Sequence, residues 1–101
     1  MLGLPETPTE AAREFYEVHV PTVQAALETA LTKSEEFTLT LMFPRADHTH
    51  TAWRLAAVQN LAREAAPVRI NGIAGEDEAA FKAALAYLAD APGITGQLLE
   101  V

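Results

Sequence analysis

The stretch from Leu61 to Gly75, LAREAAPVRINGIAG, constrains the fold more than any other part of the sequence. A helix must end there, because Pro67 has no backbone N–H and disfavours helical geometry at the residue before it. Residues 68–73 then read as a short strand with β-branched residues at alternate places. A helix that passes directly into a strand, which in turn ends in a glycine turn, indicates an α/β fold.

The same order of elements continues on both sides of this stretch. Thr7, Pro8 and Glu10 predict a capped helix start, and Pro21 predicts a kink or a split in that helix. After a turn at 33–36, strands are predicted at 37–43, 68–73 and 97–101, with helices at about 49–65 and from about 76 to the Pro92-Gly93 stop. This alternation predicts a parallel sheet with strands in chain order, joined by right-handed crossovers.

Length and composition indicate a small globular protein. With 101 residues, 50% of them hydrophobic, residues 1–101 are expected to form a single domain, in which residues 1–6 are a loose lead-in. The net charge of −7 disfavours nucleic acid and anionic membrane as partners. The sequence has no cysteine, no membrane-spanning apolar run and no signal-peptide pattern, so a cytoplasmic protein is expected.

Several short motifs together resemble the second half of the short-chain dehydrogenase/reductase family. They are PVRINGIAG at 67–75, FYEVHV at 15–20, and YLAD at 87–90 followed by ITGQ at 94–97. The likeness covers about residues 5–101 and rests on the order and spacing of these motifs. It implies a half-Rossmann-like fold, in which three short parallel strands alternate with three helices.

The sequence departs from the family at the positions that carry its chemistry. The resemblance places the catalytic asparagine on His19, the serine on Phe43-Pro44, the tyrosine on Asp47 and the lysine on Thr51. Aspartate cannot donate a proton at neutral pH as a tuned phenol can, and threonine has no charge to lower a neighbour's pKa. The proline before Gly75 is replaced by Ala74.

The half of the family fold that binds the dinucleotide has no counterpart in this sequence. That half needs a glycine-rich turn at a helix N-terminus to hold the pyrophosphate, and none of the five glycines forms such a motif. We therefore expect no cofactor and no reductase activity.

The loop at 45–50 contains metal-capable side chains, but no metal site is expected there. Asp47, His48 and His50 are close in sequence, yet the two histidines do not have the i, i+4 spacing of a helical zinc site. His19 could join them only if the fold brought it near. A polar loop that caps the second helix through Thr49 or Thr51 is the simpler interpretation. Ser34 is the only serine and lies in a charged turn, which does not support a Ser-His-Asp triad.

Three functions remain compatible with this pattern. We favour a non-catalytic domain that acts through protein association, as a homodimer formed by its first two helices. The predicted interface residues are Tyr16, Val20, Val23, Leu27, Trp53 and Ala57. One alternative is a small-molecule or nucleotide-binding module at the C-terminal ends of the strands, where Pro44, Asn71 and Gly75 would face the ligand. The other is an accessory subunit of a full-length reductase.

Overall fold

The computed structural model describes residues 2–33 and 38–101, with the backbone alone for residues 30–33. It divides into two compact units, one comprising residues 1–3 and 38–101 and the other residues 4–37. Residues 34–36 of the predicted turn at 33–36, which include Ser34, and the predicted strand residue Phe37 lie outside the described residues, while Lys33 belongs to a helix. No helix in the described ranges is both long enough and apolar enough to cross a membrane.

The unit of residues 4–37 begins with the predicted helix start. α1 (Pro8–Glu14) has Thr7 as its N-cap, and the Thr7 hydroxyl accepts a hydrogen bond from the Glu10 amide at 3.4 Å. Pro8 occupies the first turn, where its missing N–H leaves no hydrogen bond unmade. Local sequence chemistry therefore determines where this helix starts.

The predicted split of this helix is confirmed. α1 and α2 (Val20–Lys33) are separated by a π turn at Phe15–His19, in which the Val20 amide donates to the carbonyl of Phe15. Pro21 follows at once, and it has no N–H with which to continue the α-helical hydrogen bonds. Such π turns interrupt α-helices and insert an additional residue into a turn.

The π turn also changes which side chains of this helix are buried. The sequence predicts one stripe through Tyr16, Val20, Val23, Leu27 and Ala30, but Tyr16 is 45% exposed while Val23 is 7% exposed. Phe15, next to Tyr16, has no exposed surface. Because a π turn holds more residues than an α turn, positions before it are offset from a stripe counted at regular helical spacing.

The other unit is built on a sheet of three parallel strands in the order β1-β2-β3. β1 spans Thr38–Pro44, β2 spans Arg69–Gly75 and β3 spans Leu98–Glu100. The α/β class, the parallel pairing and the strand order are all confirmed. They agree with the half-Rossmann-like arrangement that the resemblance implies.

The stretch from Leu61 to Gly75 folds as a helix followed directly by a strand, as predicted, but the strand continues through Gly75 instead of ending in a glycine turn. α3 (Thr51–Ala65) ends just before Pro67, and the Ala66–Pro67 peptide bond is cis. The Val68 amide donates to the Ala65 carbonyl at 2.9 Å, and β2 begins at the next residue. Helix and central strand are thus joined with almost no loop.

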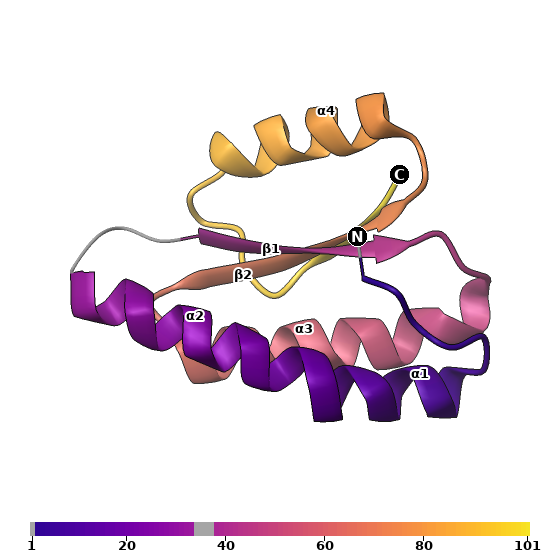
Figure 1. Ribbon diagram of the computed structural model, residues 1–101. Coiled ribbons are helices and arrows are strands. Elements are labelled where there is room, and N and C mark those ends of the chain that lie inside the picture. Colours follow the sequence, from indigo (N-terminus) through magenta and orange to yellow (C-terminus); the bar gives the residue numbers. More distant parts are fainter. Residues whose placement is uncertain (1, 34–37) are drawn as a thin grey trace. The chain divides into compact units, whose positions relative to one another are not determined.

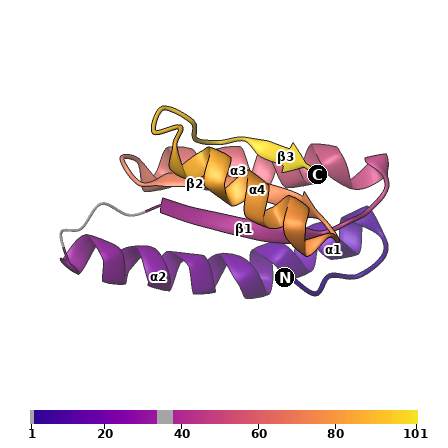
Figure 2. The same cartoon turned by 90° about the horizontal axis from the view of Figure 1, so that it is seen from above.

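α3 and α4 (Glu78–Ala89) cover opposite faces of this sheet (Figure 1). Both crossovers step in the same direction across the sheet, from β1 to β2 and from β2 to β3, as Figure 2 shows from above. Helices on opposite faces therefore give the two crossovers opposite hands. The β1–α3–β2 crossover is right-handed and β2–α4–β3 is left-handed, so the expectation of right-handed crossovers is wrong for the second.

The central strand β2 is buried on both faces. On the α4 side, Ile73 packs in one cluster with Phe81, Ala84 and Leu88. On the α3 side, a Cβ on Gly72 would lie 3.1 Å from side-chain atoms of both Phe43 and Val58, so a larger residue there would need these neighbours to shift. Apolar groups therefore pack against both faces of the central strand.

Candidate functional site

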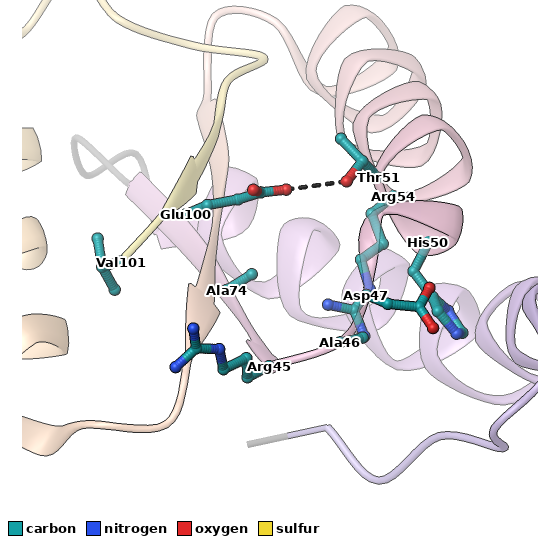
Figure 3. A pocket seen from close by; sticks show the side chains of 9 residues that line it. All are labelled: Arg45, Ala46, Asp47, His50, Thr51, Arg54, Ala74, Glu100 and Val101. Atoms are coloured by element: carbon teal, nitrogen blue, oxygen red, sulfur yellow. Dashed lines mark hydrogen bonds between the residues drawn. The ribbon is translucent and has the colours of Figure 1, made fainter.

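A cavity of about 290 Å³ opens at the edge of the sheet where the strands end. Its walls come from the loop after β1, the start of α3 and the last residues of β2 and β3 (Figure 3). This is the edge at which open α/β sheets bind ligands. The polar side chains that line it are Arg45, Asp47, His50, Thr51, Arg54 and Glu100.

Asp47 organises the loop that forms one wall of the cavity. It is the N-cap of the 3-10 turn η2 (His48–His50), and its carboxylate accepts hydrogen bonds from the Thr49 amide at 2.9 Å and from the Thr49 hydroxyl. The prediction that Thr49 or Thr51 caps the second helix is wrong, because Asp47 caps the 3-10 turn before it and His50, the N-cap of α3 (Thr51–Ala65), makes no side-chain cap bond. The same two bonds lower the pKa of Asp47, so that it is ionised at neutral pH.

Thr51 and Glu100 connect α3 to β3 on another side of the cavity. The Thr51 hydroxyl donates to Glu100 Oε1 at 2.9 Å (Figure 3). The hydroxyl proton of Thr51 is therefore already committed to a carboxylate.

Arg54 is the buried charge of the cavity. The residue is only 4% exposed, and its Nη1 donates to the carbonyl of Pro44 at 2.7 Å. Its guanidinium carbon lies 5.0 Å from the centre of the Phe43 ring and 5.7 Å from that of Trp53. Burial lowers the pKa of Arg54, while the charge of Glu100 acts in the opposite direction. The group remains a cation, since arginine does not lose its proton in proteins.

His50 and Arg45 complete the polar lining. His50 is 5% exposed, and its Nδ1 accepts a hydrogen bond from the indole N–H of Trp53 at 3.0 Å. Arg45 is exposed and forms an ion pair with Glu76 at 3.2 Å, a surface contact that contributes little to stability. Of the two arginines, Arg54 is therefore the one that the fold holds in a fixed place.

The three residues predicted to face a ligand do not line this cavity. Pro44 is the last residue of β1, and its carbonyl is used by the buried guanidinium. Asn71 has no exposed surface, and its side chain is hydrogen bonded at both ends to the backbone of residues 94–97. Gly75 is covered by Val101, whose carbonyl oxygen would lie 2.8 Å from a Cβ at that position.

The predicted interface residues differ widely in exposure. Tyr16 is 45% exposed, Val23 is 7% exposed and Ala57 has no exposed surface. The other three, Val20, Leu27 and Trp53, are half-buried. Val18, which the sequence did not single out, is 55% exposed in the same π turn as Tyr16. This turn therefore holds the two most exposed of these apolar side chains.

Sequence reasoning missed Arg54 and Glu100. Arg54 had a usable signal, because it lies four residues before Val58 and seven before Leu61 and so falls on the buried face of α3. Glu100 had none, since its place in the cavity depends on where β3 pairs in the sheet.

Some of the positions that match catalytic residues in the family resemblance lie around the cavity. Asp47 and Thr51, which match the tyrosine and the lysine, both line it, and so does Ala74, which stands for the motif proline. Phe43, at the position of the serine, is buried, and His19 belongs to the other unit. Within residues 2–33 and 38–101, no group of three or more His, Asp or Glu side chains could hold a metal ion.

Residues 1–101 match the model of a protein family described as short chain dehydrogenase-like protein. The match includes both compact units. No curated protein and no solved structure matches the chain.

Proposed function

The chain belongs to the short-chain dehydrogenase-like family, and from this premise we propose that it is a non-catalytic member that acts through protein association, as a cytoplasmic homodimer. The observation that carries the proposal is the chemistry at Asp47 and Thr51. These two residues line the cavity at the carboxyl edge of the sheet, at the positions that match the family's tyrosine and lysine.

Neither side chain can replace its family counterpart. A reductase of this family needs a group that donates a proton near neutral pH and a cation that tunes it. Asp47 has a lowered pKa because Thr49 donates two hydrogen bonds to its carboxylate, so it has no proton to give. Thr51 is uncharged and is bound to Glu100. The pair supports a protein that has kept the fold of its family without the proton-transfer chemistry.

Calorimetric titration with NADH and NADPH tests the loss of cofactor binding. We expect no saturable binding tighter than about 1 mM, which corresponds to roughly −4 kcal/mol. Reduction of a panel of aldehydes and ketones, followed by loss of NADPH absorbance, should remain at the rate without protein. Saturable binding with a dissociation constant below about 1 mM, or turnover of any of these substrates, would contradict the non-catalytic assignment.

The case for association rests on the exposed apolar side chains of the first helical segment. Tyr16 and Val18 are 45% and 55% exposed in the same π turn, and Val20 and Leu27 follow as half-buried residues. Neighbouring exposed apolar side chains favour contact with another protein surface. A second copy of this chain is the proposed partner, and a full-length reductase is the alternative.

Size-exclusion chromatography with light scattering tests the homodimer. The wild-type protein should have a dimer mass at micromolar concentration, and Tyr16→Glu should weaken the dimer at least about tenfold by placing a charge in the contact. Tyr87→Glu is the matched control, since Tyr87 is 53% exposed on α4 and lies outside the predicted interface. A wild-type monomer at high concentration would contradict the homodimer, and equal effects of both variants would contradict its location.

A further inference from the structure

Arg54 is a buried cation whose hydrogen-bonding capacity is mostly unused. A guanidinium carries several N–H donors, and the Pro44 carbonyl at 2.7 Å accounts for one of them. Nε is buried and has no hydrogen-bond partner in the described parts of the chain. Burying a charge without sufficient partners destabilises a fold. The side chain lines the cavity, so an anion bound there can pair with the charge of the guanidinium (Figure 3).

The carboxylates of the cavity are already used by other groups. Asp47 accepts both of its hydrogen bonds from Thr49. Glu100 accepts from Thr51, and it acts on Arg54 through its charge without an ion pair between the two described side chains. An anion that enters the cavity therefore does not have to displace a protein carboxylate from Arg54.

The charges around the cavity select the kind of anion. Two arginines, Arg45 and Arg54, and two carboxylates, Asp47 and Glu100, line the cavity, and Arg45 is already paired with Glu76 outside it. Attraction to Arg54 and repulsion by both carboxylates each grow in proportion to the charge of the ligand and largely cancel. The hydration that the ligand loses on entering the cavity grows more steeply with its charge, so a single negative charge is favoured over two. The volume of about 290 Å³ is at the lower end for ligand sites, which suits a small molecule.

We propose that this cavity binds a small organic monocarboxylate whose carboxylate group pairs with the guanidinium of Arg54. The flat carboxylate matches the planar donor arrangement of a guanidinium. The Phe43 ring, 5.0 Å from the guanidinium carbon, covers the cation and strengthens the attraction by limiting access of water. This binding goes beyond the proposed association and does not depend on it, because the cavity is lined entirely by one unit of the chain.

Titration of ¹⁵N-labelled protein with sodium acetate at pH 7 tests the proposal, with sodium chloride at equal ionic strength as the blank. We expect saturable shifts of the Arg54 Nε–H signal and of the amides of Asp47 and Thr51, with half-saturation at about 1–10 mM. Inorganic phosphate should bind more weakly than acetate. No saturation by acetate up to about 100 mM would overturn the site, and tighter binding of phosphate would overturn the choice of a monoanion.

Three variants show whether Arg54 holds the anion. Arg54→Met should weaken acetate binding at least about tenfold, and Glu100→Gln should tighten it about threefold or more by removing a repelling charge. Arg63→Met is the matched control, because Arg63 is an exposed cation on the same helix and outside the cavity. If Arg54→Met does not fold, the acetate affinity of Glu100→Gln still tests the proposal. Unchanged binding in either cavity variant would refute the role given to Arg54.

Discussion

Arg69 lies at the amino end of β2, and its guanidinium donates to four acceptors of the fold. Nη1 donates to three carbonyls at the end of α4 and in the loop after it, at 3.3, 2.9 and 3.4 Å, and Nη2 donates to the Thr38 hydroxyl at 3.1 Å. Arg54 lies at the carboxyl end of the same sheet and is more deeply buried, yet it donates to a single carbonyl and leaves Nε unpaired. Arginine thus donates to four acceptors at the amino end of the sheet and to a single acceptor at the carboxyl end.

The polar groups around Arg69 at the amino end of the sheet are hydrogen bonded to one another and to the backbone, as expected for a structural role. Asn71 is hydrogen bonded through both its amide nitrogen and its oxygen, and the Ile70 amide donates to the Thr95 hydroxyl at 3.0 Å. Paired polar groups stabilise a fold, whereas an unsatisfied buried group destabilises it and calls for an explanation in function. The amino end therefore holds the sheet together, and the carboxyl end is arranged for a ligand.

The largest effect is expected at the amino end, from Asn71→Leu. This change removes both side-chain hydrogen bonds of a fully buried residue, and it should lower the free energy of unfolding by about 2–3 kcal/mol. Urea denaturation followed by tryptophan fluorescence measures it. Asn60→Leu, at an exposed position of α3, should change the value by less than about 0.5 kcal/mol. Equal losses in the two variants would show that Asn71 does not hold the amino end.

Arg69→Met and Arg54→Met compare the two ends directly. Arg69→Met should lower the free energy of unfolding by about 2 kcal/mol, because it removes the charged hydrogen bonds to the carbonyls of Leu88 and Ala91, which then keep only their backbone donors. Without ligand, Arg54→Met should cost less than about 1 kcal/mol, because an apolar side chain relieves an incompletely paired buried charge. The same denaturation assay gives both values. A larger loss for Arg54→Met would mean that Arg54 is the structural arginine.

The smallest expected effect is on how the stability of the protein depends on pH in the acidic range. Hydrogen bonds from Thr49 lower the pKa of Asp47 below its usual 3.8, so the ionised carboxylate stabilises the folded state. This stabilisation is present above about pH 4 and is lost as the pH falls through the lowered folded pKa. Asp47→Asn cannot lose a proton-linked contribution, so its urea midpoint should fall less than that of the wild type between pH 5 and pH 3. Parallel pH profiles would contradict the assignment of Asp47 as the ionised cap.

The fold was predictable where local chemistry decides it. Pro67 marks the passage from α3 to β2, Thr7 caps α1, and Pro21 splits the first helix, all through interactions within a few residues. The face that α4 covers was not predictable, because the β2–α4–β3 crossover departs from the right-handed rule. The exposure of Tyr16 was also not predicted, because the sequence pattern was counted at regular helical spacing and a π turn precedes α2.

The site was predictable in place but not in detail. The general behaviour of parallel sheets indicates the carboxyl edge, and the cavity is there. Asn71 looked suitable for a ligand because it is polar and near a strand end, but the loop at 94–97 takes both of its hydrogen bonds. Arg54 was not singled out, although its spacing to Val58 places it on the buried face of α3. Such contacts depend on which distant segments meet.

The most direct test of the difference between the two ends is the stabilisation that acetate gives to three proteins. With half-saturation at about 10 mM, 100 mM acetate should raise the free energy of unfolding of the wild type by ~1.4 kcal/mol over 100 mM chloride. Arg69→Met should be less stable but keep this increment in full, whereas Arg54→Met should lose it. An increment that survives in Arg54→Met, or disappears in Arg69→Met, would contradict the account of an open carboxyl end and a closed amino end.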